Sequence, residues 1–164
     1  MAVECFLKFE GPELKGESKG DKHDGEIDVT AWSWGATQSG TMHVGTGGGS
    51  GKADVHDLSI TKWVDMASPN LMQSVISGKQ FEKARLLCRK VGGTAPVDYV
   101  TIEMEKVIIT SLTTGGNGDE DRFSERMTLN FAQYKKTYTP QKDDGSAGTA
   151  VGPVGWKIRE NVTT

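Results

Sequence analysis

Apolar and polar residues alternate along much of the chain, with the period of a half-buried β-strand. The first such run places Val3, Cys5, Leu7 and Phe9 on one face. Further strands are predicted within residues 27–34, 37–44, 54–64, 83–91, 97–112, 123–138 and 154–158. The alternation changes phase within 54–64, which predicts a bulge or bend there.

One segment has helical spacing instead. Ser68 and Pro69 form an N-cap and first-turn pair, and Gly78 ends the apolar pattern that follows them. The apolar residues at helical spacing are Leu71, Met72, Val75 and Ile76. The pattern therefore predicts one short helix.

These elements predict the fold class. Roughly seven or eight one-sided strands with a single helix are typical of a sandwich or barrel, not of a layered α/β domain. We expect an all-β fold, a compact β-barrel of two sheets with one short flanking α-helix. At 164 residues and 17.7 kDa, the chain has the size of one domain, covering residues 1–164.

Composition and charge argue against several classes of protein. The formal net charge of -3 argues against nucleic-acid binding, which needs a basic surface. The first residues lack the features of a secretory signal peptide, and the sequence contains no apolar stretch long enough for a transmembrane helix. We therefore expect synthesis in the cytoplasm and no membrane insertion, with export left only to a machine that needs no signal peptide.

No residue pattern indicates an enzyme. Cys5 and Cys88 alternate with apolar neighbours and are interpreted as reduced core residues. None of the three histidines lies in a recognisable catalytic signature. We expect no catalytic turnover and no cofactor.

The segment GTGGGSGK resembles a phosphate-binding P-loop but departs from it twice. Thr46 stands where the first glycine is needed, and Ala53 follows Lys52 where a hydroxyl is needed for Mg²⁺. A strand is also predicted after it, and not a helix. Nucleotide binding is therefore not favoured.

Two groups of side chains contain residue types that bind metal ions. Met42, His43, Asp54, His56 and Asp57 lack the dense spacing of metal ligands. The acidic residues 119–121 lack the alternating oxygen ligands of an EF-hand, and a charged hairpin tip explains them better. No metal is expected.

The tryptophans leave a second function open, a small-ligand module that stacks sugars or binds nucleotides. In residues 31–34, Trp32 and Trp34 share one face of the strand, and Ala31 and Ser33 share the other. Buried tryptophan is the commoner outcome in a β-core. The face with small residues is then free to line an open space.

Ordered motifs across almost the whole chain resemble the hemolysin-coregulated protein (Hcp) family of type VI secretion systems. They are MAVECFLKFEG, KGESK, EIDVTAWSWG, QSGTMHVGTGGGSGKADVHDLSITKWVD, SPNLM, TTGGNGDEDRFSERMTLNFAQ, YTPQK and GWKIRENV. Departures are confined to predicted loops, around residues 11–14 and between Lys142 and Pro153.

This resemblance implies a β-barrel with a flanking helix and a homo-hexameric ring. Stacked rings would form the inner tube that a contractile sheath fires behind a VgrG-like spike protein. Effector proteins would travel in the lumen, held non-covalently because no fused toxin follows the barrel. The protein would be cytoplasmic before firing and then be secreted to the extracellular space or a target cell.

Two candidate surfaces of such a ring are predicted from the residues, and the resemblance supports the second. Ala31 and Ser33 are predicted to face the lumen and its cargo. The following loop is predicted to contact neighbouring subunits or the next ring, because so many glycines are costly to order without a partner. Its residues are Thr41, Met42, His43, Val44, Gly45, Thr46, Gly47, Gly48, Gly49, Ser50, Gly51 and Lys52. The alternative for this loop is a disordered hairpin tip.

Overall fold

The computed structural model describes residues 2–46 and 48–164, and these contain eleven strands and one helix. The strands are β1 (Ala2–Glu10), β2 (Ile27–Val29), β3 (Ala31–Ser33), β4 (Ala36–Thr37), β5 (Asp54–Val55), β6 (Leu58–Trp63), β7 (Gln80–Val91), β8 (Val97–Gly115), β9 (Ser124–Tyr138), β10 (Val151–Lys157) and β11 (Val162–Thr163). The helix is α1 (Ser68–Ser77). The predicted all-β class with one short helix is confirmed.

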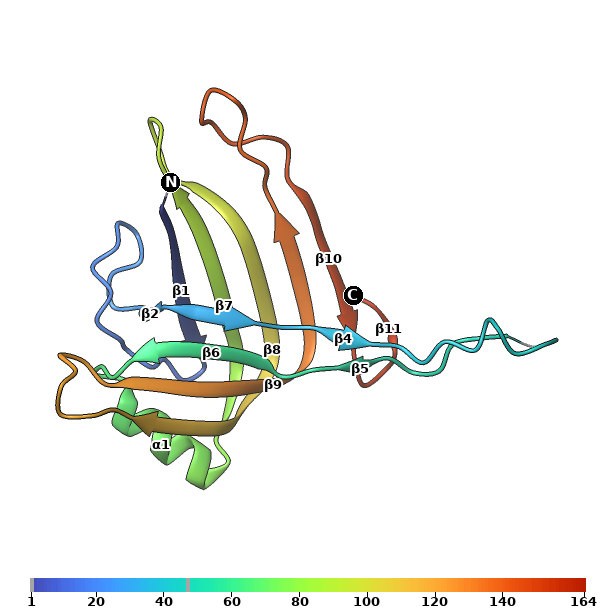
Figure 1. The fold of residues 1–164 in the computed structure, drawn as a ribbon, viewed down its shortest axis with the longest axis horizontal. Coiled ribbons are helices and arrows are strands. Elements are labelled where there is room, and N and C mark those ends of the chain that lie inside the picture. Colours follow the sequence, from blue (N-terminus) through green and yellow to red (C-terminus); the bar gives the residue numbers. More distant parts are fainter. Residues whose placement is uncertain (1, 47) are drawn as a thin grey trace.

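Antiparallel pairing closes most of these strands into a barrel (Figure 1). Strand β1 pairs with β2 and β7, β7 with β8, β8 with β9, and β9 with β6. The circuit closes because β3 pairs with β6, and the Thr30 amide between β2 and β3 donates to the Thr61 carbonyl at 2.9 Å. The short pair β4–β5 forms a separate sheet.

The inward face of the barrel carries the core, as the alternation predicts. In β1, Leu7 and Phe9 are fully buried, and in β9 Met127 and Leu129 are. Burying such side chains contributes roughly 1.5–3 kcal/mol each. The helix packs against β8, with Leu71 buried and Met72 exposed. It covers one end of the barrel (Figure 1).

The predicted cap of the helix is wrong at one residue. Ala67, not Ser68, occupies the N-cap position, and it makes no side-chain cap hydrogen bond. The Ser68 hydroxyl instead accepts from the Asp65 amide at 2.9 Å and donates to the Glu125 carboxylate at 2.8 Å. The predicted stop is confirmed, because Gly78 has a left-handed φ of 65°.

Two of the predicted strands are shortened or divided, and one predicted break is confirmed. The strand predicted over 37–44 is wrong beyond Thr37, since the residues after it have no core to cover and lie exposed. The run 27–34 divides at Thr30, where the chain changes partner from β1 to β6. The break predicted within 54–64 is confirmed between Val55 and Leu58.

Candidate functional site

The most prominent surface feature is an arm, residues 36–55, that projects from the barrel (Figure 1). Strands β4 and β5 form its base, with Ala36 opposite Val55. Further out, an isolated bridge joins Gly40 to Ser50. The hydroxyl of Thr41 donates to the Gly49 carbonyl at 2.8 Å and accepts from the Gly49 amide at 3.0 Å. The arm is thus an ordered ribbon and not a featureless loop.

The predicted assembly residues form the outer half of this arm. Those that the structure describes are exposed, and Gly47 lies outside the described residues. Met42 and Val44 are 81% and 59% exposed, so two apolar side chains stand free at the arm's far end. Gly48 lies close to the facing chain, since a Cβ there would be 3.2 Å from the Met42 Cα and the Thr41 carbonyl oxygen.

The P-loop resemblance is not supported by the geometry of this segment. The glycine run leads into β5 and not into a helix, so the array of amides that a helix N-terminus offers to phosphate is lacking here. The lysine at its end, Lys52, is exposed in the arm.

Strand β3 separates small and large residues as predicted. Ala31 and Ser33 are exposed on the outer face of the barrel, whereas Trp32 and Trp34 pack against the core. The Trp34 indole N–H donates to the His56 carbonyl at 2.8 Å, and its ring packs edge-on to Tyr134. Neither Trp32 nor Trp34 is a free stacking platform.

Strand register extends the small outer face across four strands. Ser33 lies opposite Ser59, which lies opposite Thr128, which lies opposite Ser111. A second row parallel to it joins Ala31, Thr61, Arg126 and Thr113. We call these eight residues the small polar face. Only its β3 members can be predicted from the sequence, because the others become neighbours only through strand pairing.

Beside the small polar face, Asp57 is held by hydrogen bonds. Its carboxylate accepts from the Thr110 hydroxyl at 2.6 Å and from the Asn130 amide at 2.8 Å. These bonds explain Asp57 without a metal. Among the described residues, no group of three or more His, Cys, Asp or Glu side chains is placed to hold a metal ion.

A buried ion pair fixes the end of the barrel near the helix. The Lys62 ammonium is fully buried and lies 2.9 Å from both the Glu125 and the Asp65 carboxylates. Burial alone would raise the pKa of Glu125, but hydrogen bonds from Lys62, Ser68 and Thr114 outweigh it and lower that pKa. The cluster ties β6, β9 and the helix start together.

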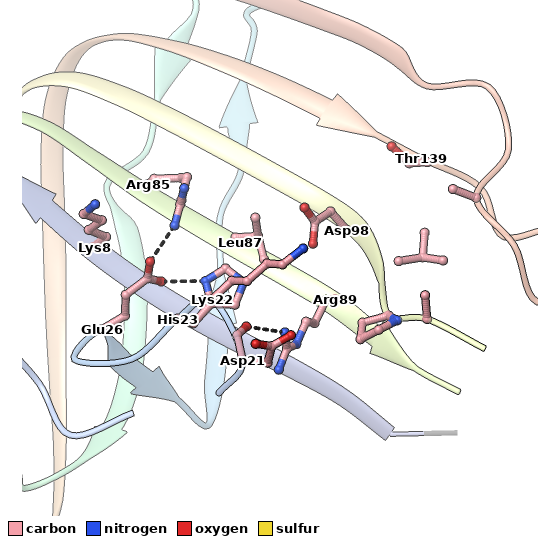
Figure 2. Close-up of a pocket in the computed structure, with 14 residues that line it drawn as sticks. Lys8, Asp21, Lys22, His23, Glu26, Arg85, Leu87, Arg89, Asp98 and Thr139 are labelled. Atoms are coloured by element: carbon pink, nitrogen blue, oxygen red, sulfur yellow. Dashed lines mark hydrogen bonds and ion pairs between the residues drawn. The ribbon is translucent and has the colours of Figure 1, made fainter. Parts of the chain in front are cut away.

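Of the described hollows, the one with the greatest volume, about 660 Å³, lies on the outer face of β1 and β7 (Figure 2). Glu26 accepts from the Arg85 guanidinium at 2.7 Å and lies 3.1 Å from the His23 ring nitrogen. Arg89 donates to the Asp21 carbonyl at 2.9 Å, and the His23 ring stacks on Phe6. Glu26 thus binds both His23 and Arg85, and Arg89 holds the backbone at Asp21, so we interpret these contacts as fastening the loop 16–26 to the sheet.

A second hollow lies where the arm meets the barrel. It is lined by Trp34, Val55, Tyr134, Val151 and Val154, and Val151 and Val154 are 63% and 66% exposed. This is the most apolar of the described hollows, and it belongs to an edge formed by β9 and β10.

Comparison with known proteins identifies the family. Residues 6–138 match the family described as "Type VI secretion system effector, Hcp". The chain is 51% identical over 162 residues to Protein hcp1 of Pseudomonas aeruginosa, covering 99% of both chains. The chain belongs to the Hcp family.

Solved Hcp-like structures agree with this assignment. A structure described as that of a type six secretion system protein superposes with a TM-score of 0.92 at 31% identity, over 99% of this chain and 100% of the other. Hcp1 from Salmonella typhimurium superposes with a TM-score of 0.78 at 32% identity, over 100% of both chains. The chain is thus a type VI secretion protein with the Hcp fold. No helix in the described part of the chain is long and apolar enough to cross a membrane.

Proposed function

We propose that this chain is the structural subunit of a type VI secretion inner tube. It forms homo-hexameric rings, the rings stack, and the tube carries effector proteins in its lumen behind a spike and inside a contractile sheath. The whole chain acts as one domain without catalytic activity. It is exported from the cytoplasm without a signal peptide and is released outside the cell or into a target cell.

The observation that carries the proposal is the arm. Residues 36–55 leave the barrel as a ribbon whose far end exposes Met42 and Val44 and buries almost nothing against its own subunit. Ordering such a glycine-rich ribbon costs conformational entropy, which contact with a second subunit offsets. Methionine is well suited to that contact because its flexible thioether adapts to the partner's surface. Family membership supports the same role.

The small polar face supports the position of the lumen. Seven of its eight residues have short side chains, six of them with a hydroxyl, and Arg126 is its single charged residue. The face therefore leaves room for a passing protein and offers little charge that would hold it. We assign Ala31 and Ser33 to the lumen wall together with the six other residues of this face.

The test is the oligomeric state of the purified chain. Size-exclusion chromatography with light scattering is expected to give the mass of a hexamer, which would be about six times 17.7 kDa. A small-ligand module would usually elute as a monomer or dimer. A monomer at every protein concentration tested would overturn the proposal.

A further inference from the structure

The two cysteines of the chain lie side by side. Cys5 of β1 and Cys88 of β7 are directly opposite each other in the antiparallel ladder, and both are free thiols. Directly opposite residues in such a ladder have Cα atoms about 4.5–5.5 Å apart, within the roughly 4.4–6.8 Å that a disulfide spans. No strand movement is needed to bring the two sulfurs within bonding reach.

The two thiols differ in access. Cys88 is buried at 2% exposure, whereas Cys5 is only partly buried and lines a surface hollow with Val3, Ser18 and Asp28. A small oxidant therefore reaches Cys5 first. Cys88 lies directly across the ladder, where it can attack the Cys5 sulfur once Cys5 has formed a mixed disulfide.

The surroundings favour the thiolate at Cys5. Hydrogen bonding from the Cys88 thiol, and then from the Trp32 indole N–H, lowers the pKa of Cys5 despite its partial burial. The same pairing and burial raise the pKa of Cys88. The thiolate is the attacking species in thiol–disulfide exchange, so Cys5 is the nucleophile and Cys88 the resolving thiol.

We propose that Cys5 and Cys88 are a redox-modification site that closes to a cross-strand disulfide when the chain meets a small disulfide oxidant such as glutathione disulfide. The Cys5 thiolate attacks one glutathione sulfur, forms a mixed disulfide and releases one glutathione thiolate. Cys88 then loses its proton, attacks the Cys5 sulfur and releases the second glutathione thiolate. Both cysteine sulfurs are oxidised, one glutathione disulfide is reduced to two glutathione molecules, and the two cysteine protons end on them.

The disulfide would link β1 covalently to β7 next to Trp32. This inference does not depend on the proposed tube function, because it uses only the pairing of β1 with β7. A chain that failed to form rings would still carry the pair. Cross-strand closure is therefore testable on the purified protein in any oligomeric state.

The experiment equilibrates the purified chain in buffers of increasing glutathione disulfide to glutathione ratio. Remaining thiols are alkylated after acid quenching and denaturation, and the intact mass is measured. Wild type is expected to lose two hydrogen atoms and to take up no alkyl group at oxidising ratios. Cys88→Ser is expected to accumulate glutathione on Cys5, and Cys5→Ser is expected to remain unmodified at Cys88.

Three results would overturn the proposal. The first is a wild-type chain that keeps two alkylatable thiols at a ratio where Cys88→Ser is fully glutathionylated. The second is a wild-type chain that stops at a stable glutathione adduct. The third is a disulfide between two chains instead of one within the chain. Far-UV circular dichroism tests whether the two variants remain folded. If either variant is unfolded, the thiol and disulfide state of the wild-type chain decides whether the proposal holds.

Discussion

The Lys62 ammonium and the Glu125 carboxylate lie 2.9 Å apart, and neither side chain is more than 3% exposed. Removing one partner from such a pair leaves the other buried and uncompensated, which costs about 3–5 kcal/mol. Lys62→Met should therefore lower the free energy of unfolding by about that amount in urea denaturation. The double variant Lys62→Met, Glu125→Leu should recover most of the loss.

The matched control for this pair is Lys8→Met. Lys8 lies 3.5 Å from Glu10 at the surface, where ion pairs contribute about 0–1 kcal/mol. A loss from Lys8→Met as large as that from Lys62→Met would contradict the role of burial.

The lowered pKa of Glu125 predicts an acid-sensitive contribution to stability. Because the folded-state pKa lies below the ordinary value of 4.5, the contribution is complete above that value and is lost as pH falls through the folded-state pKa. Denaturation midpoints measured from about pH 6 to pH 3 should fall less steeply for Glu125→Gln than for wild type. Parallel pH profiles would show that Glu125 does not supply this dependence.

Charge at the tip of the arm should prevent assembly. Met42→Glu places a carboxylate in the apolar contact proposed with the neighbouring subunit, so the oligomer should dissociate while the barrel remains folded. Light scattering measures the first effect and far-UV circular dichroism the second. Ile76→Glu is the control, because Ile76 is 79% exposed on α1, away from the arm. If Ile76→Glu reduced assembly as much as Met42→Glu, Met42 would have no specific role in assembly.

Shortening residues 45–51 to a tight turn tests the same surface without adding charge. The barrel should fold with an unchanged far-UV spectrum, since none of the described residues in this range belongs to the core. Ring assembly and secretion should both fall. A shortened chain that assembles and is exported normally would rule out an assembly role for the arm.

Longer side chains on the small polar face should weaken cargo binding. Ser33→Gln and Thr113→Gln each place bulk on this face from different strands, and both should reduce co-purification of an effector while leaving rings intact. Ser77→Gln on the helix is the control, because Ser77 is exposed but not on this face. If Ser33→Gln and Thr113→Gln retain cargo as well as Ser77→Gln does, the lumen lies elsewhere.

Gly155 of β10 should not tolerate a side chain. A Cβ there would collide with the Tyr134 backbone carbonyl on the paired strand, and backbone moves less readily than a side-chain tip. Gly155→Ala should cost about 1–3 kcal/mol in urea denaturation. Gly118→Ala, at a hairpin position with open space, should be nearly neutral. If Gly155→Ala were as stable as Gly118→Ala, β10 would have to move away from β9 at no cost to accommodate the added side chain.

Local pattern was sufficient to predict the barrel strands and the end of the helix. In β1 and β9 the alternation is strict because one face covers the core, so Leu7 and Leu129 report their burial directly in sequence. Gly78 ends the helix for a purely local reason, its left-handed backbone. The strand predicted after Thr37 is wrong because the apolar residues of the arm do not cover a core. Alternation alone does not show whether an apolar face is buried or exposed.

The small polar face shows what sequence could not supply. Ala31 and Ser33 were found because two tryptophans mark the opposite side of the same strand. Thr128 and Ser111 carry no such marker, and only the register of β6, β9 and β8 brings them beside Ser33. The pairing of Cys5 with Cys88 is likewise not visible in the sequence, since 82 residues separate them and only the ladder brings them together.

Strand β9 has a mechanical consequence. Its first half pairs with β6 at the small polar face, and its second half pairs with β10 at the base of the arm, while β8 runs along it from Ser124 to Tyr138. A load applied along β9 therefore acts on the ladder with β8 in shear, so many backbone hydrogen bonds must yield together. The small polar face and the base of the arm therefore share one continuous strand, so a displacement at one surface acts on the other through β9.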